Sequence, residues 1–197
     1  MAKNRRNKNI SVPTTDQIES EILREKYNRR YKQVIKSTIY SLIVIAALAV
    51  LVATLVFPVL QISGSSMEPT LEDEDIVVLL KAKDLKRGEL CCFSYQNKLL
   101  IKRVIGLPGD TVNIDEQGRV YVNGELLDEP YVVEQSLGES DITYPCNVSE
   151  NHYFVLGDHR ATSIDSRCSV IGLVSEEYIV GKIFFRIWPL ENIDIIK

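Results

Sequence analysis

A long uncharged stretch near the amino terminus restricts this chain more than any other feature. From Ser37 to Met67 the sequence contains no Asp, Glu, Lys, Arg or His, and Ile39–Leu60 is almost wholly aliphatic. As a helix, Ile39–Leu60 would extend about 33 Å at about 1.5 Å per residue, which matches a hydrocarbon core of about 30 Å. The stretch is too long and too uniformly apolar for a buried core helix. A fully soluble chain is therefore excluded.

The same stretch does not read as a cleaved targeting signal. The apolar core of a secretory signal has about 7–15 residues and a small-residue cleavage site follows it, whereas this one ends in Phe57-Pro58-Val59-Leu60-Gln61. We therefore predict an uncleaved transmembrane anchor over residues 37–61, with the lipid bilayer as a partner.

Charge divides the chain at the anchor. Residues 1–36 hold ten Lys or Arg and four Asp or Glu, a net +6, while residues 37–197 hold thirteen and twenty-three, a net −10; the two sum to −4. The acidic larger part argues against a nucleic-acid partner. The positive-inside rule predicts a cytoplasmic basic arm, 1–36, and an extracytoplasmic domain, 62–197, in a single-pass protein of the cell membrane. The bases nearest the anchor are Arg24, Lys26, Arg29, Arg30, Lys32 and Lys36.

The arm itself has two expected parts. Met1–Pro13 is polar and is expected to be disordered, whereas Thr14-Thr15-Asp16 offers helix caps, so a helix is expected from about Thr15. That helix could continue directly into the membrane. Its bases could contact lipid headgroups, but a topological signal alone is the simpler interpretation.

Residues after Leu60 show the pattern of a mainly β domain. Short β-branched and aromatic runs alternate with Gly, Pro, Asn and Asp, and little regular helix is expected. The predicted strands are Asp75–Lys81, Glu89–Tyr95, Lys98–Gly106, Thr111–Asp115, Val120–Val122, His152–Leu156, Ile171–Val174 and Val180–Ile187.

The four cysteines and two histidines give weak signals. Cys91 and Cys92 are neighbours in a predicted strand, so they point to opposite faces and are expected to fill the core. Cys146 and Cys168 flank a loop-rich region and could form a disulfide. No Cys and His spacing is typical of zinc, so neither a metal nor another cofactor is expected.

Two segments could carry chemistry. Ser63–Thr70 is rich in small residues and could present a hydroxyl beside an extended chain, although composition alone favours a flexible hinge. Neither histidine has the spacing of a triad base, so a lysine is the other candidate. Lys102 lies in an apolar strand, where desolvation would favour the neutral amine that can deprotonate a serine. Taken alone, the segment favours a solvent-exposed lysine at a strand edge.

Four blocks together decide between these interpretations. They are Ser63-Gly64-Ser65-Ser66-Met67-Glu68-Pro69-Thr70-Leu71, Asp75-Ile76-Val77-Val78, Lys102-Arg103-Val104-Ile105-Gly106-Leu107-Pro108-Gly109-Asp110, and Gly157-Asp158-His159-Arg160-Ala161-Thr162-Ser163-Ile164-Asp165-Ser166-Arg167. In content and order, behind an amino-terminal anchor, they resemble the bacterial type I signal peptidases. The resemblance implies a signal-peptidase-like β domain of antiparallel sheets. It also implies a membrane-bound serine endopeptidase that removes signal peptides from exported preproteins and is linked functionally to the secretion machinery.

The resemblance also implies roles for individual residues. Ser66 would be the nucleophile and Lys102 the general base, with Ser163 orienting the lysine. Asp165 and Arg167 would form a supporting ion pair. Asp158 and Arg160 would serve the geometry of the same loop.

The oxyanion donors are only partly implied. The backbone N–H of Ser66 is the expected donor. Some relatives add a hydroxyl two residues earlier, where this chain has Gly64, so the second donor could be main chain or water. Departures from the commonest family block, at His159, Ala161 and Thr162, are expected to tune the loop and not to abolish activity.

Specificity is expected to come from shallow apolar pockets beside a substrate that adds as a strand. By resemblance, these pockets accept small residues such as Ala at the first and third positions before the cut. The candidate lining residues are Ile62, Met67, Leu71, Leu100 and Ile101, of which Leu71 and Leu100 could equally be core. Only 46 residues separate Asp110 from Gly157, which resembles the compact Gram-positive type.

Two other functions were weighed. A self-cleaving Ser–Lys repressor would be soluble and would carry a helix-turn-helix, and this chain has an apolar span instead. A catalytically inactive, membrane-anchored protein that binds preproteins or assists pilus assembly would lack the serine or the lysine, and this chain has both.

Overall fold

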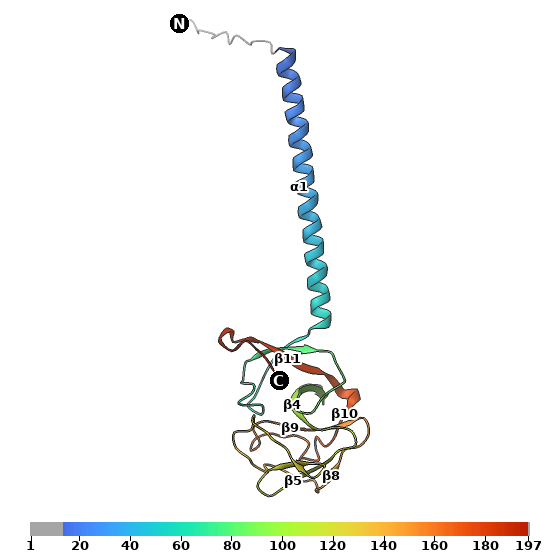
Figure 1. The fold of residues 1–197 in the computed structure, drawn as a ribbon, viewed down its shortest axis with the longest axis vertical. Helices are drawn as coiled ribbons and strands as arrows, with labels where there is room; N and C mark the ends of the chain where they lie inside the picture. The colour runs from blue at the N-terminus through green and yellow to red at the C-terminus, as the bar shows by residue number, and fades with distance from the viewer. Residues whose placement is uncertain (1–13, 197) are drawn as a thin grey trace, which may run out of the picture. The chain divides into compact units, whose positions relative to one another are not determined.

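The computed structural model of the protein describes residues 14–196, and the predicted disorder of Met1–Pro13 lies outside them. Its first element is a single helix, α1 (Thr15–Val56), drawn without interruption in Figure 1. The backbone N–H of Thr14 donates to Gln17 Oε1 at 3.1 Å, which satisfies one free N–H at the helix start. Within the described residues, α1 is the one helix that is long and apolar enough to cross a membrane.

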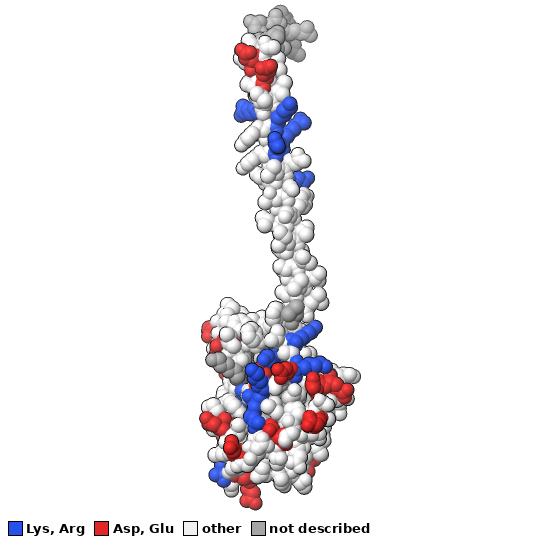
Figure 2. Space-filling model, turned by 45° about the vertical axis from the view of Figure 1, so that its right-hand side comes forward, with Lys and Arg blue, Asp and Glu red and all other residues white. Residues whose placement is uncertain are grey.

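α1 ends earlier than predicted. The helix stops at Val56, so the prediction of helix to Leu60 is wrong, and Val59–Gln61 form strand β1 instead. Pro58 explains the difference, because it lacks a backbone N–H and disfavours helical geometry at the residue before it. Figure 2 shows charged side chains along the first part of α1 and an uncharged stretch along the rest. Every α1 side chain that the structure describes is exposed.

The remaining residues form a β domain of two antiparallel sheets, which confirms the predicted fold class. The larger sheet has the order β1-β2-β11-β3-β4-β9-β10, and β12 pairs with β11. The smaller sheet has the order β7-β6-β5-β8, and in Figure 1 its strands β5 and β8 lie at the end of the β domain away from β11. The larger sheet contains β1 (Val59–Gln61), β2 (Ile76–Leu80), β3 (Leu90–Tyr95), β4 (Lys98–Gly106), β9 (His152–Leu156), β10 (Val174–Ser175), β11 (Ile179–Trp188) and β12 (Asp194–Ile195). The smaller one contains β5 (Thr111–Ile114), β6 (Val120–Val122), β7 (Glu125–Leu126) and β8 (Cys146–Asn147), and two short 3₁₀ turns are η1 (Glu176–Tyr178) and η2 (Leu190–Asn192).

Most predicted strands are confirmed, three of them with the predicted bounds: β4, β6 and β9. The prediction of a strand over Ile171–Val174 is wrong for all but its last residue. The N–H groups of Ile171 and Gly172 both donate to the Cys168 carbonyl, which closes a turn there. The strands that were not predicted, β1, β7, β8 and β12, have two or three residues each, too few for a pattern in the sequence.

The cysteines lie in the core without disulfides. Cys91 and Cys92 pack in two different clusters of buried residues, on opposite faces of β3, as predicted. All four cysteines are free thiols, so the possible disulfide between Cys146 and Cys168 is not formed. The Cys168 thiol instead donates to the Glu139 carbonyl at 3.2 Å.

Strand β4 has an unpaired edge that is important for the site. Its whole length pairs with β3, but β9 pairs with it only at Arg103, Val104 and Gly106. No strand of the described part of the chain covers the second edge of residues 98–102. The backbone groups along that edge are therefore able to accept an added strand.

Candidate active site

Ser66 lies in the irregular segment that follows β1. The Gly64 N–H donates to Asp73 Oδ1 at 2.8 Å, and the Ile62 N–H donates to the Asp75 carbonyl at 2.8 Å, so the two ends of the segment are joined to each other. The Ser66 carbonyl accepts from the His159 N–H at 3.2 Å. The loop after β9 is thereby bound directly to the segment that carries Ser66.

Lys102 projects from β4 into a site from which water is largely excluded. It is 4% exposed, and its cross-strand partner on β3 is the fully buried Cys91. Its Nζ donates to Ser163 Oγ at 2.9 Å. Burial lowers the pKa of Lys102 to about 8, because the desolvated ammonium is disfavoured; Asp165 opposes the shift and Arg167 adds to it. A substantial fraction of this amine is therefore neutral near physiological pH.

Asp165 and Arg167 form a buried ion pair behind Ser163. Arg167 Nε donates to Asp165 Oδ1 at 2.8 Å and Nη2 to Oδ2 at 2.9 Å, so the contact is bidentate. Arg167 also donates to the carbonyls of Leu137 at 2.6 Å and Arg160 at 2.9 Å. The pair fixes the loop, and the guanidinium offsets the charge that Asp165 would otherwise exert on Lys102.

Gly157 permits the close packing of three site elements. A Cβ at this position would overlap Ser163 Oγ and would lie 2.6 Å from the Ser66 carbonyl oxygen. The Gly157 N–H donates to Asp165 Oδ2 at 2.9 Å. Only a residue without a side chain fits between the Ser66 segment and the Ser163 loop.

Asp158 and Arg160 belong to two separate buried ion pairs. Asp158 accepts from Arg103 Nε at 2.8 Å and Nη2 at 2.6 Å, and Thr70 Oγ1 donates to the same carboxylate at 2.5 Å. Arg160 pairs with Glu129 and donates from Nε to the Gly157 carbonyl at 3.0 Å.

Sequence reasoning missed the partners of both residues. Arg103 follows Lys102 directly in the third block, and this position could have identified it as part of the site. The ring of Tyr131 stacks 3.9 Å from the Arg103 guanidinium carbon. Glu129 and Tyr131 lie in an irregular segment with no local pattern, and nothing in the sequence identified them.

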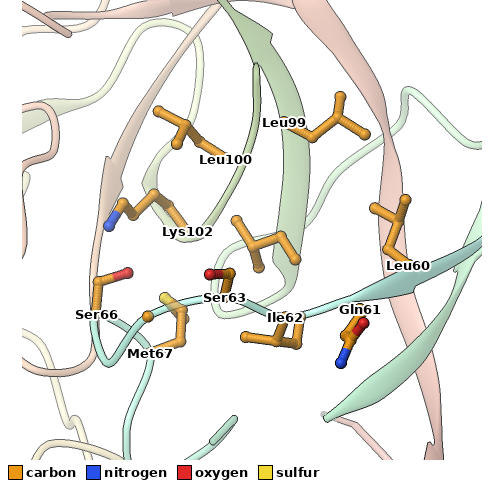
Figure 3. A pocket seen from close by; sticks show the side chains of 11 residues that line it. Leu60, Gln61, Ile62, Ser63, Ser66, Met67, Leu99, Leu100 and Lys102 are labelled. Atoms are coloured by element: carbon orange, nitrogen blue, oxygen red, sulfur yellow. The ribbon is translucent and has the colours of Figure 1, made fainter. Parts of the chain in front are cut away.

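A pocket of about 380 Å³ opens beside Ser66 and Lys102. Figure 3 shows Ser66 and Lys102 at one end of it and Leu60 and Gln61 at the other. Four of the five predicted lining residues line it: Ile62, Met67, Leu100 and Ile101. Leu71 does not, because it is fully buried in the core cluster with Met67 and Val77, so its assignment to the lining was wrong. Leu60, Gln61, Ser63 and Leu99 line the pocket as well and were not predicted.

The described residues, 14–196, contain no group of three or more His, Cys, Asp and Glu side chains that could hold a metal ion. The polar side chains that line the pocket are the hydroxyls of Ser63 and Ser66, the Gln61 amide and the buried Lys102 amine. An antiparallel β domain with a serine and a buried amine in one pocket, together with one helix apolar enough to cross a membrane, points to a membrane-associated class of protein that could carry out acyl transfer by a serine.

Comparison with known proteins identifies the family. Residues 35–188 match the family model described as signal peptidase, peptidase S26. A Bacillus amyloliquefaciens protein named signal peptidase I is 34% identical over 180 residues, which cover 86% of this chain and 96% of that one. A Synechocystis protein named probable signal peptidase I-2 is 38% identical over 161 residues, or 76% of this chain and 71% of that one. A crystal structure of a signal peptidase I from Enterococcus faecalis is 30% identical and aligns with a TM-score of 0.43, covering 50% of this chain and 96% of that one.

The chain belongs to the signal peptidase family, peptidase S26. The relatives support signal peptidase I, a serine endopeptidase, as its activity. The resemblance seen in the four sequence blocks is thereby confirmed.

Proposed function

We propose that this protein is a membrane-anchored signal peptidase I that cleaves preproteins after an Ala-X-Ala type sequence, with Ser66 as nucleophile and Lys102 as general base. One observation carries the proposal: the buried Lys102 amine has a lowered pKa, is bound to Ser163, and shares a pocket with Ser66. A buried amine that is partly neutral near pH 7 is the base that a serine without a histidine partner requires.

The reaction balances with these two groups and one water. Lys102 accepts the Ser66 proton while Ser66 Oγ attacks the carbonyl carbon of the last signal-peptide residue. The tetrahedral intermediate collapses, the C–N bond breaks, and the amine of the mature protein leaves with the proton from Lys102. Water, deprotonated by Lys102, then hydrolyses the ester and regenerates Ser66. No hydrogen bond joins Ser66 Oγ to Lys102 Nζ within residues 14–196, and we expect it to form when substrate binds, as is common for catalytic contacts.

The backbone N–H of Ser66 is our proposed oxyanion donor. It donates to no acceptor in the described part of the chain, so it is available to the developing negative charge. Gly64 offers no hydroxyl there, so a second donor would be main chain or water.

The surrounding polar residues are proposed to hold Lys102 in place without favouring its protonated form. Ser163 is a neutral acceptor for the Lys102 amine, whereas a carboxylate in its place would favour the ammonium. Asp165 is neutralised by Arg167, and the pair keeps Ser163 in position. Asp158 and Arg160 support the loop through Arg103 and Glu129.

Substrate binding is proposed to use the unpaired edge of β4. An extended signal peptide would add to residues 99–102, which line the pocket, and its alternate side chains would enter that pocket. Ile62, Met67, Leu100 and Ile101 narrow the pocket, which favours small residues at the first and third positions before the cut.

We further propose that residues 1–36 are cytoplasmic and that the β domain acts outside the cytoplasm on secreted preproteins that the secretion machinery delivers. The uncharged, exposed half of α1 supports membrane insertion, and the bases that precede it support this orientation. A catalytically inactive preprotein-binding or pilus-assembly protein is the alternative, and the presence of both Ser66 and Lys102 argues against it.

The test is cleavage of a preprotein with an Ala-X-Ala signal by the detergent-solubilised full chain. We expect a cut after the second Ala in the wild type, shown by sequencing the new amino terminus, and no cut by Ser66→Ala or Lys102→Ala. Lys102→Arg should also fail, because a guanidinium stays protonated. Lys81→Arg changes an exposed lysine that lines neither the pocket nor the free edge of β4, so it is the matched control and should cleave. Substantial turnover by either alanine variant would remove the Ser–Lys pair, and no turnover by a folded wild type would favour the binding protein.

A further inference from the structure

A second hollow of about 470 Å³ lies on the other side of the proposed catalytic pair. It shares five lining residues with the first pocket, among them Ser66, Leu100 and Lys102. It then continues in a different direction, toward the turn between β3 and β4 and the loop that follows Ser163. The two hollows are therefore one cleft, and Ser66 and Lys102 lie where its two halves meet.

The far wall of this second hollow is apolar and exposed. Ile164 and Val170 line it, and they are 53% and 64% exposed. An apolar side chain that packs against them would remove this apolar surface from water. Ile164 and Val170 are presented by a fixed loop, because the Asp165–Arg167 pair anchors one end and the Tyr95 hydroxyl donates to the Val170 carbonyl at 2.8 Å at the other.

The charged side chains that line the hollow are all basic. Apart from the buried Lys102, its only charged lining residue among those described is Lys98, which is exposed at the start of β4. Because side chains alternate along a strand, Lys98, Leu100 and Lys102 share one face of β4 and all three line the hollow. A peptide bound there would contact the apolar wall of Ile164 and Val170 and the flexible ammonium group of Lys98.

We propose that this second hollow binds the first residues of the mature protein, positions +1 to +3 after the cut, and that it prefers an apolar side chain and disfavours a basic one. The inference rests on the proposed function. If the residues before the cut occupy the first pocket, an extended peptide must continue past Ser66 into the other half of the cleft. Ile164 and Val170 line that half of the cleft, so they are the apolar residues that the mature segment would contact.

The order of the chemical steps means that the second hollow can affect acylation but not deacylation. When the C–N bond breaks, the mature segment leaves the second hollow with its new amine, and the signal segment stays as an ester on Ser66. Contacts in the second hollow therefore change the rate of acylation, whereas hydrolysis of the ester proceeds with that half of the cleft empty. Residues +1 to +3 should alter kcat/KM and leave deacylation unchanged.

The experiment uses the full chain in detergent and peptides that are identical before the cut but carry Leu, Ser, Lys or Glu at +2. For the wild type we expect Leu to exceed Ser in kcat/KM, and Glu to exceed Lys. Val170→Ser should lower the Leu-to-Ser ratio about three- to tenfold, since it removes apolar contact. Lys98→Glu should reverse the Glu-to-Lys preference with a total change of about fivefold.

Two matched controls localise the effect. Val133→Ser removes the same side chain from a site that is 83% exposed and lines neither pocket, and it should leave every ratio unchanged. Discrimination between Ala and Leu at −3, measured with Val170→Ser, should equal that of the wild type.

The outcomes separate the two proposals. A wild type that cleaves none of the peptides contradicts the proposed function itself. A wild type that cleaves, with ratios at +2 that Val170→Ser and Lys98→Glu do not alter, overturns only the second hollow. An altered −3 ratio in Val170→Ser would overturn it too, because the hollow would then hold the signal segment.

Discussion

At the scale of single residues, Lys102 connects burial to pH dependence. A general base acts when neutral, and the pKa of Lys102 is lowered to about 8 by desolvation. The neutral fraction would then rise from about one-tenth at pH 7 to about nine-tenths at pH 9. We expect kcat/KM for an Ala-X-Ala peptide to rise through a midpoint near pH 8. A profile that is flat from pH 6.5 to 9.5 would contradict this role.

The same residue predicts a stability effect of known sign. The unfolded lysine keeps its proton up to about pH 10.5, so between about pH 8 and 10.5 the unfolded state binds more protons and the free energy of unfolding rises with pH. Below about pH 8 the full cost of the buried ammonium applies, about 3 kcal/mol. Lys102→Met should therefore raise the free energy of unfolding at pH 7 and flatten its rise above pH 8. Thermal unfolding in detergent, from pH 7 to 10, measures both.

Gly157 gives a steric prediction. Its missing side chain leaves room for the Ser163 hydroxyl and the Ser66 carbonyl, so Gly157→Ala must push the two segments apart. We expect kcat to fall at least about a hundredfold, since displacements of about 1 Å are costly in catalysis. Circular dichroism should still report a folded β domain. Near wild-type activity would show that the loop yields without disturbing the pair.

At the scale of elements, the Arg103–Asp158 pair joins β4 to the loop after β9. Both side chains are almost fully buried, and breaking such a pair leaves an uncompensated charge. Asp158→Leu or Arg103→Met alone should lower the free energy of unfolding by about 3–5 kcal/mol. The double variant should lose much less than the sum, and chemical denaturation of all four proteins measures the difference. Additive losses would mean that the two side chains are not coupled.

β4 also shows which properties of a strand can be predicted from the sequence. Its bounds, Lys98–Gly106, were predicted without error because Ile101, Val104 and Ile105 favour strand and the turn residues Leu107-Pro108-Gly109-Asp110 follow directly. Its partners were not predicted, and they decide its role: β9 covers only the last part, and the first part keeps a free edge. For α1 the predicted end itself was wrong. Pro58 ends the helix at Val56, before the apolar run ends.

At the scale of the whole molecule, the exposed apolar half of α1 and the charge division predict membrane topology. In sealed spheroplasts, added protease should degrade the β domain while an epitope at residue 1 stays protected. Replacing the six bases from Arg24 to Lys36 with Gln should yield molecules in both orientations. Replacing Lys3, Arg5, Arg6 and Lys8, which lie farther from the span, should not. A protected β domain in the wild type would reverse the proposed orientation.

Features that depend on neighbouring residues were determined by the sequence alone. An uncharged run long enough to cross a bilayer, alternating strand residues, and four ordered blocks were sufficient to predict the anchor, the β domain and the family, because each signal is local. The same blocks predict the site residues, which are Ser66, Lys102, Ser163, Asp165 and Arg167.

Only the tertiary structure decided which distant residues meet. Arg103 and Asp158 are 55 positions apart and Arg160 and Glu129 are 31 apart, and no local pattern couples charges over such separations. Tertiary packing also decided three other features. They are the lack of space for a side chain at Gly157, the burial of Leu71 in the core, and the second half of the cleft. Each is set by packing between segments whose separation along the chain carries no information about their distance in the fold.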